Sequence, residues 1–356
     1  MNRSELAPEK LKLIRRGTVI PATPLALNAQ RQLDERRQRA LIRYYIDAGV
    51  GGIAVGMHFT QFEIRTPGVD LYEPVMRLCA EECDKQSAKA GRPILKVAGI
   101  NGRTQTAIEQ AKLAKELGYD VAIISMAAFN GALEQEMIHH VKQIAEIMPV
   151  FGFYLLTGVG GIHLPYEFWL ELAKIENVVG IKIAPFDRYG TIDVVRAIAD
   201  SGRADDITLY TGNDDSILYD FITPFRFSEN GPTVRIRGGL LGQWGCWTKK
   251  AVALHERMLK IIDGEEAITP ELLTLSAQIT DANAALFDPA HNFAGSIPGV
   301  NEVLTRQGLL EGAWTLKRDE VLSPGQAEEI TRVCDAYPHL TDDDFVKENL
   351  ERWMED

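Results

Sequence analysis

One lysine lies in a segment of this sequence where a charged side chain is unexpected. Lys182 belongs to VVGIKIA (178–184), an apolar run rich in β-branched residues that contains no acidic residue. Burial disfavours the ammonium form, and lowering the pKa of a lysine from about 10.4 to near 7 costs about 4.6 kcal/mol. What results is a neutral amine, the nucleophile that condenses with a ketone to form a Schiff base. The alternative is a lysine that extends its ammonium group to water at a sheet edge.

A tyrosine in a second apolar run is the candidate partner of this amine. Tyr154 lies near the end of VFGFYLL (150–156). Its phenol can transfer a proton to or from the substrate if the two strands are neighbours. A core tyrosine bonded to a carbonyl is the alternative, since most buried phenols have that role. The sequence predicts that Lys182 and Tyr154 form a catalytic pair.

The elements that would position this pair follow a regular alternation of short apolar runs and amphipathic stretches. This alternation is typical of a parallel sheet with crossover helices, and eight such units in about 250 residues favour a (β/α)₈ TIM barrel. The expected strands are TVIPA from Thr18, GIAV from Gly52, ILKVAG from Ile94, VAIIS from Val121, VFGFYL from Val150, VVGIKIA from Val178, ITLYTG from Ile207 and VRIRGGLLG from Val234. Helical spacing of apolar residues marks 33–49, 106–118, 134–148 and 215–225 between them.

The pattern becomes wholly helical after about residue 265. We therefore expect a catalytic barrel over 1–265 and a helical extension over 266–356 that packs on the barrel or on a second subunit. No low-complexity linker separates the two parts, so they are expected to fold as one unit.

Loops that follow the strands supply candidate substrate contacts, because barrel enzymes carry their active sites at the carboxyl ends of the strands. Gly56, Met57 and His58 follow the second strand, Gly212 opens GNDD (212–215) and Gly242 belongs to GGLLGQWG (238–245). Glycines let the backbone approach a ligand and turn N–H groups toward an anion. His58 is as well explained by a structural role.

Three other groups of polar residues have simpler interpretations. Asp214 and Asp215 are expected to cap the helix that follows them. His139 and His140 are expected on a solvated helix face, because nothing supplies further metal ligands. Cys79 and Cys83 stand one helical turn apart and are expected to be small buried residues. The sequence predicts no metal site and no disulfide.

Composition restricts the partners and the compartment. The 356 residues are 46% hydrophobic and carry a net charge of −12. Nucleic acid and anionic membranes would require a basic face that this sequence lacks. The charged first residues and the absence of long apolar stretches favour a cytoplasmic protein that acts on a small molecule.

At this point the sequence resembles the dihydrodipicolinate synthase and N-acetylneuraminate lyase superfamily of class I, Schiff-base-forming aldolases and dehydratases. The resemblance covers about residues 18–310 and rests on GTVIPATPL, GGIAVG, VAGI, the Tyr154 run, GIK at Lys182 and TGNDD, in the family's order and spacing. It implies that Lys182 forms the Schiff base, that Tyr154 relays protons and that Gly212 lines the pocket. It also implies a homo-oligomer, either a dimer or a tetramer.

Several positions depart from the family's pattern. The hydroxyl-rich signature for the carboxylate of a 2-oxo acid is replaced by Gly56, Met57, His58, Phe59 and Thr60. Val159 stands where the synthases have an arginine, five residues after the tyrosine. Ala128 and Phe129 replace the paired tyrosines after the fourth strand, and Ile183 replaces the glutamate that often follows the lysine. Dihydrodipicolinate synthesis itself is therefore not expected.

The sequence thus favours a lyase in which Lys182 attacks a 2-oxo acid, or its aldol adduct, and no metal or organic cofactor is needed because the iminium is the electron sink. Two alternatives remain. One is a hydratase-aldolase for an apolar or aromatic substrate, suggested by Met57, Phe59, Phe129, Val159 and Trp244 around the expected mouth. The other is a non-catalytic barrel that binds a metabolite.

Overall fold

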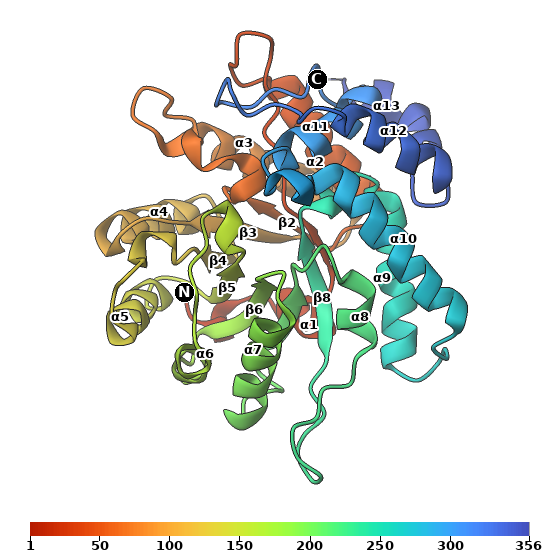
Figure 1. The fold of residues 1–356 in the computed structure, drawn as a ribbon. Coiled ribbons are helices and arrows are strands. Elements are labelled where there is room, and N and C mark those ends of the chain that lie inside the picture. The colour runs from red at the N-terminus through yellow and green to blue at the C-terminus, as the bar shows by residue number, and fades with distance from the viewer. Residues whose placement is uncertain (356) are drawn as a thin grey trace. The chain divides into compact units, whose positions relative to one another are not determined.

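Eight strands form one sheet in the computed structural model, which describes residues 1–355 (Figure 1). Their order is β1-β8-β7-β6-β5-β4-β3-β2, and a parallel bridge between Ala22 and Ala54 joins β1 to β2, so the order closes on itself. The strands are β1 (Val19–Pro21), β2 (Gly52–Val55), β3 (Leu95–Ile100), β4 (Val121–Ile124), β5 (Val150–Leu155), β6 (Val178–Ala184), β7 (Thr208–Thr211) and β8 (Ile236–Leu241). The predicted (β/α)₈ fold is confirmed.

Helices alternate with these strands and then continue alone. Those that accompany the strands are α1 (Pro8–Arg16), α2 (Glu35–Ala48), α3 (Tyr72–Ala90), α4 (Thr104–Glu116), α5 (Glu134–Ala145), α6 (Tyr166–Ala173), α7 (Arg188–Asp200), α8 (Ile217–Ile222) and α9 (Thr248–Ile262). The extension consists of α10 (Pro270–Phe287), α11 (Ser296–Arg306), α12 (Gln326–Ala336) and α13 (Asp343–Trp353). The helical pattern expected after about residue 265 is confirmed by these four helices. Among residues 1–355, no helix is both long enough and apolar enough to cross a membrane.

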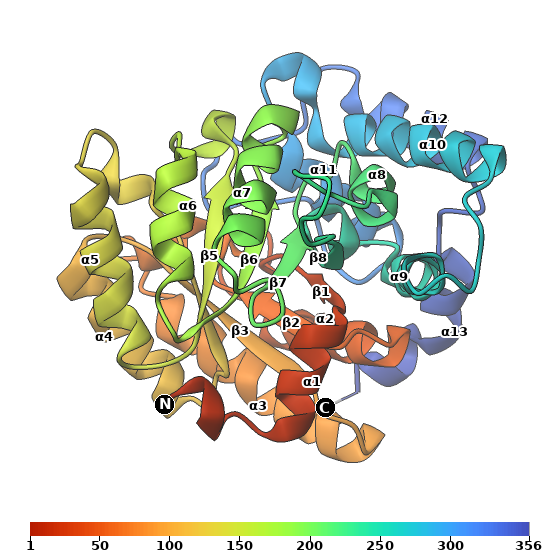
Figure 2. The same cartoon turned by 90° about the horizontal axis from the view of Figure 1, so that it is seen from below.

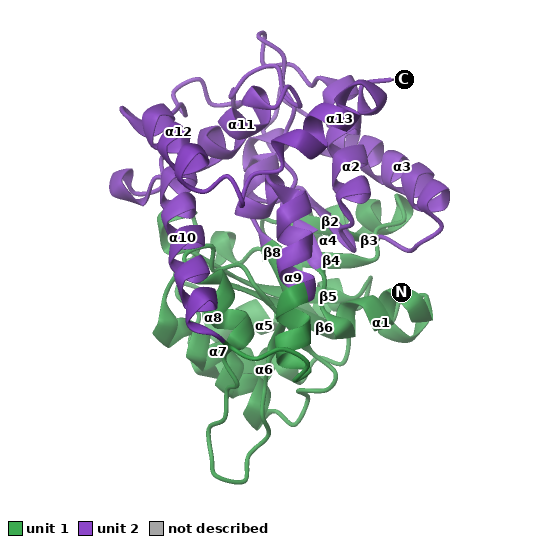
Figure 3. Cartoon of the chain, turned by 90° about the vertical axis from the view of Figure 1, so that its right-hand side faces the viewer, with its two compact units in different colours: residues 1–18, 95–240, 257–268 green, residues 19–94, 241–256, 269–356 purple. Residues whose placement is uncertain are grey.

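Two compact units interleave along the chain (Figure 3). The first contains residues 1–18, 95–240 and 257–268, and the second contains residues 19–94, 241–256 and 269–355. These units do not follow the predicted boundary at residue 265, because the extension shares the second unit with α2, α3, β1 and β2. The division into a barrel of 1–265 and an extension of 266–356 stays a prediction.

The first unit has aromatic residues on the inner face of its strands. The rings of Phe151 and Tyr210 are 5.2 Å apart, and a methyl group at Gly180 would come within 2.7 Å of the Phe151 ring. The Tyr210 hydroxyl donates a hydrogen bond of 3.0 Å to the carbonyl of Ile14 in α1. Packed rings therefore fill the interior below the carboxyl ends of these strands, where Figure 2 shows α6 and α7 beside β5 and β6.

In the second unit, buried polar contacts join α2 to α13. The Tyr44 hydroxyl donates to Asp342 at 2.7 Å, and the backbone N–H of Thr248, the first residue of α9, donates to the same hydroxyl. Asp342 also accepts from Gln307 at 2.9 Å, and its burial raises the pKa of the carboxyl group. Each lost partner would leave a buried polar group unsatisfied, which is why this cluster fixes the position of α13.

Candidate active site

Lys182 is a buried amine on the inner face of β6. The side chain is 7% exposed, and its Nζ lies 4.7 Å from the centroid of the Phe153 ring. A methyl group at Gly212 would lie 2.6 Å from Lys182 Cε, so only glycine leaves room for the lysine stem. Gly212 thus lies beside the lysine stem, and its predicted role in lining the substrate pocket stays a prediction.

The environment of Lys182 favours its neutral form. Burial lowers the pKa of Lys182 to about 8, and the negative charge of Asp214 opposes this shift. With a pKa of about 8, roughly a tenth of the amine is unprotonated at pH 7 and half at pH 8. A nucleophilic amine is therefore present at ordinary pH.

Asp214 is the residue near Lys182 that the sequence interpretation assigned wrongly. The N-cap of α8 is Ser216, so neither Asp214 nor Asp215 occupies the N-cap position that the sequence predicted for them. Asp214 is instead 3% exposed and close enough to Lys182 for its charge to raise the lysine pKa. A buried carboxylate beside a buried amine is an arrangement that can move protons.

A hydrogen-bonded network holds the loop that carries Asp214. Asp220, which is fully buried, accepts hydrogen bonds from Thr211 Oγ1 at 2.6 Å and from Asn213 Nδ2 at 2.9 Å. Asn213 in turn accepts from the backbone N–H of Phe186, the second residue after β6. The loops after β6 and β7 are thereby tied together, and this fixes the segment between Gly212 and Asp215.

Tyr154 is not the residue of β5 that is paired with Lys182, and its predicted catalytic role stays a prediction. In the register of β5 and β6, Phe153 is paired with Lys182 and Tyr154 with Ile183. Because successive side chains of a strand point to opposite faces, the Tyr154 phenol lies on the side opposite to the amine. Phe153 is the ring that β5 places beside Lys182.

The contacts of Tyr154 agree with this placement. Its ring packs against Trp169 of α6 at 5.4 Å, and a methyl group at Gly190 of α7 would lie 3.3 Å from its hydroxyl. The hydroxyl lies 3.3 Å from Nδ1 of His163 and accepts a hydrogen bond of 3.5 Å from the backbone N–H of Leu164. Burial raises the pKa of the phenol. Tyr154 therefore lies between the strand and its covering helices.

Phe129, a predicted substrate contact, is 1% exposed and lies among the helices of the first unit. Its ring is 4.5 Å from that of His140 on α5, and the guanidinium of Arg103 lies 4.8 Å from its centroid. His140 is fully buried, so the prediction of a solvated face is wrong for this residue, and burial lowers its pKa to about 4. Contact between Phe129 and a substrate stays a prediction.

In the second unit, the loop after β2 uses most of its polar groups internally. The backbone N–H of Gly56 donates to Thr60 Oγ1 at 3.0 Å, and this hydroxyl donates to the carbonyl of Thr23. Met57 is 2% exposed, whereas His58 is half-buried with its ring 5.4 Å from that of Phe59. The Gly56 amide is thus already paired, which argues against the predicted role in holding an anion. Substrate contacts by Met57 and His58 stay predictions.

Gly242, the remaining predicted contact, is a packing residue. A methyl group at this position would lie 2.2 Å from the Phe59 ring and 2.7 Å from that of Phe287 in α10. The glycine is therefore explained by the close approach of two aromatic rings rather than by a ligand. Within residues 1–355, no group of three or more His, Cys, Asp or Glu side chains is arranged to hold a metal ion.

The fold and the site thus define a (β/α)₈ protein with a buried lysine, Lys182, on the inner face of its sixth strand. The model of the dihydrodipicolinate synthetase family matches residues 15–224. This chain belongs to that family.

Its curated relatives include 4-hydroxy-tetrahydrodipicolinate synthases from several bacteria. The chain is 31% identical to the synthase of Ruthia magnifica over 185 residues, which is 52% of this chain and 58% of the relative. It is 29% identical to that of Herminiimonas arsenicoxydans over 203 residues, 57% of this chain and 64% of the relative. The match thus spans about three fifths of the length of these relatives.

Solved structures confirm the fold over nearly the whole chain. A dihydrodipicolinate synthase from Oceanobacillus iheyensis has a TM-score of 0.71 at 18% identity and covers 92% of this chain and 99% of its own. An N-acetylneuraminate lyase from Fusobacterium nucleatum, solved with pyruvate, has a TM-score of 0.69 at 17% identity with the same coverage. The resemblance to the superfamily drawn from the sequence is confirmed.

Proposed function

We propose that this protein is a Schiff-base-forming lyase, an aldolase or dehydratase, that acts on a 2-oxo acid or its aldol adduct. The observation that carries the proposal is the Lys182 amine, buried on the inner face of β6, packed against Gly212 and Phe153 and lowered in pKa to about 8. Family membership and the pyruvate-bound lyase among its structural relatives support the same chemistry.

The chemistry begins when the neutral amine attacks the carbonyl carbon of the 2-oxo acid. The carbinolamine that forms loses its hydroxyl as water, with one added proton, and becomes an iminium. In aldol cleavage the iminium accepts the electron pair of the breaking C–C bond. In dehydration it accepts the pair of a C–H bond, and the enamine that forms expels the β-hydroxyl, which leaves as water with one added proton. Hydrolysis of the imine releases the product and restores Lys182.

Asp214 is the proton carrier in this proposal. Tyr154 lies on the opposite face of β5, whereas the Asp214 carboxylate interacts with Lys182 and is held by the loop that Asn213 and Asp220 fix. The negative charge of Asp214 stabilises the iminium. Its carboxylate can also accept the proton of the substrate hydroxyl during aldol cleavage.

The test is reductive trapping with pyruvate and borohydride. We expect a covalent adduct that peptide mass mapping places on Lys182. Lys182→Met, which keeps the length and apolar stem, should abolish the adduct, and Lys112→Met on the exposed face of α4 should not. An adduct at another lysine, or none across a broad panel of 2-oxo acids, contradicts the proposal.

A second candidate is a hydratase-aldolase for an aromatic or otherwise apolar substrate. The Phe153 ring, whose centroid lies 4.7 Å from Lys182 Nζ, favours this substrate class. An aromatic substrate can stack on the ring, whereas a polar substrate would need a protein hydroxyl at this place. Comparing aldol cleavage of aromatic and hydroxylated aliphatic adducts of pyruvate distinguishes the two. Trapping without turnover of either class would indicate the metabolite-binding barrel instead.

We also propose a cytoplasmic homo-oligomer, a dimer or tetramer. The composition supports the compartment, and the oligomer is what membership of the family implies. One structural relative is described as a monomeric variant of dihydrodipicolinate synthase, so light scattering of the purified chain is the direct test.

A further inference from the structure

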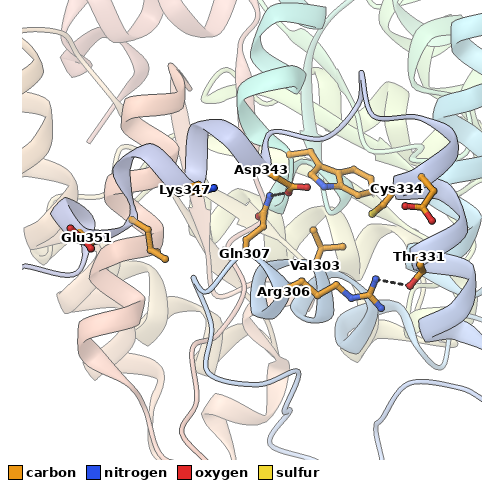
Figure 4. Close-up of a pocket in the computed structure, with 11 residues that line it drawn as sticks. Val303, Arg306, Gln307, Thr331, Cys334, Asp343, Lys347 and Glu351 are labelled. Carbon is orange, nitrogen blue, oxygen red and sulfur yellow. Dashed lines mark hydrogen bonds between the residues drawn. The ribbon is translucent and has the colours of Figure 1, made fainter.

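A cavity of about 560 Å³ lies among the helices of the extension, all within the second unit (Figure 4). Such a volume falls in the range of small-molecule sites. Figure 4 shows Lys347 and Glu351 of α13 on one side and Thr331 and Cys334 of α12 on the other. Helix α11 and Trp247, the residue before α9, complete the lining.

Two buried polar atoms of this lining have no partner among residues 1–355. Trp247 is 4% exposed, and its indole Nε1 is buried without an acceptor. Gln307 Oε1 is likewise buried without a donor. The other end of this amide, Nε2, donates to the carboxylates of Asp342 and Asp343. A buried donor and a buried acceptor left unsatisfied each cost free energy that a ligand would recover.

The cavity is lined by charged groups of both signs. Lys347 is exposed and forms no ion pair within the part of the chain described here, whereas Arg306 is held by Glu302 and Thr331. Three carboxylates line the cavity as well: Asp343, which accepts from Gln307, and Asp335 and Glu351. The ammonium of Lys347 and the indole N–H of Trp247 can bind an anionic acceptor. The amide oxygen of Gln307 and the carboxylates can bind a cationic donor.

We propose that this cavity binds a small zwitterion that carries a carboxylate and an ammonium group, the chemistry of a free amino acid. Its carboxylate accepts from Trp247 Nε1 and pairs with Lys347. Its ammonium donates to Gln307 Oε1 and faces the carboxylates. Val303, Leu350 and the indole ring of Trp247 provide the apolar surface for its carbon skeleton.

Two features of Trp247 link the cavity to the loop after β8. This residue directly follows the segment that contains Gly242 and Trp244, and its φ of +51° is a left-handed conformation that a tryptophan rarely adopts. Backbone strain of this kind persists where the surroundings fix it and often marks a functional position. A ligand that bonds to the indole therefore holds a strained residue at the base of α9.

Calorimetric titration of the full chain with each of the twenty standard L-amino acids tests the proposal. We expect at least one to bind in a single site with a dissociation constant between about 1 µM and about 1 mM. Trp247→Phe, which keeps the ring and removes the N–H, should weaken binding by about 10-fold or more, and so should Lys347→Met.

The controls separate this site from the active site and from unfolding. Trp314→Phe and Lys112→Met lie outside the cavity and should leave binding unchanged, and so should Lys182→Met, which removes the amine of the proposed active site. Lys347 is exposed, so its variant tests the site even if Trp247→Phe does not fold. Absence of binding by every amino acid, or wild-type affinity in both cavity variants, would overturn the proposal.

Discussion

Replacing Lys182 by methionine should stabilise this protein at neutral pH and much less at alkaline pH. The unfolded chain binds a proton on this lysine up to about pH 10.5, whereas the folded chain releases it near pH 8. Between these values the unfolded state holds more protons, so the stability of the wild type rises with pH. Below pH 8 this difference in pKa amounts to about 3 kcal/mol against folding.

Methionine does not titrate, so the difference in unfolding free energy between the variant and the wild type should follow the lysine alone. From the two pKa values, this difference is about 3 kcal/mol larger at pH 7 than in the fully deprotonated limit, but only about 1 kcal/mol larger at pH 10. The expected change between pH 7 and pH 10 is thus about 2 kcal/mol. Differences in packing between methionine and lysine cancel in this comparison.

Urea unfolding of both proteins at pH 7, 8, 9 and 10, followed by tryptophan fluorescence, measures the change. Lys112→Met provides the matched control, because this lysine is exposed and its replacement should show no such dependence on pH. A difference between Lys182→Met and the wild type that stays constant from pH 7 to pH 10 would refute the reasoning. It would mean that Lys182 keeps an ordinary pKa and is not a nucleophile at neutral pH.

Three further changes test the other parts of the site. Asp214→Asn should lower turnover by on the order of 10² to 10⁴, and removal of its charge should move the pH midpoint of borohydride trapping below that of the wild type; an unchanged midpoint would separate Asp214 from the amine. Tyr154→Phe should leave trapping unchanged and cost only about 0.5 to 1.5 kcal/mol of stability, measured by urea unfolding, because its hydroxyl faces Leu164 and His163; lost trapping would return it to the catalytic face. Condensation of pyruvate with aspartate semialdehyde in a coupled assay should run at least about 10²-fold below aldol cleavage of the true substrate, since no arginine follows β5 to bind the second carboxylate, and efficient condensation would show that the departures from the synthases are neutral.

The strands and their order could be predicted from the sequence because each is a short apolar run between polar segments. β2, β5 and β6 begin and end at the residues where their runs do, and the buried state of Lys182 follows from its neighbours in β6. The face of Tyr154 could not be predicted in this way. Phe153 and Tyr154 are adjacent in a run that is apolar throughout, and only the register against β6 decides which of them lies beside the lysine.

Asp214 was missed for a related reason. An acidic residue before a short helix is a common N-cap, and its sequence offers no sign that Ser216 takes this position instead. The buried Asp220 six residues later decides the outcome, because it holds Thr211 and Asn213 and so turns the loop inward. Contacts between a loop and the helix that follows it are set by tertiary packing, not by local propensity.

The C-terminal extension packs on the loop after β2, which departs from the family pattern. The backbone N–H of Leu316 donates to Gln61 Oε1 at 2.6 Å, and Lys317 forms an ion pair with Glu63 at 2.6 Å, which raises the pKa of the lysine. Phe287 of α10 packs on Phe59 at 5.4 Å in the same unit. This loop therefore supports the extension through Phe59, Gln61 and Glu63, of which only Phe59 stands within the signature that departs from the family's pattern. The aromatic ring at position 59 is thus explained by its packing on α10, and contacts of Met57 and His58 with a substrate stay predictions.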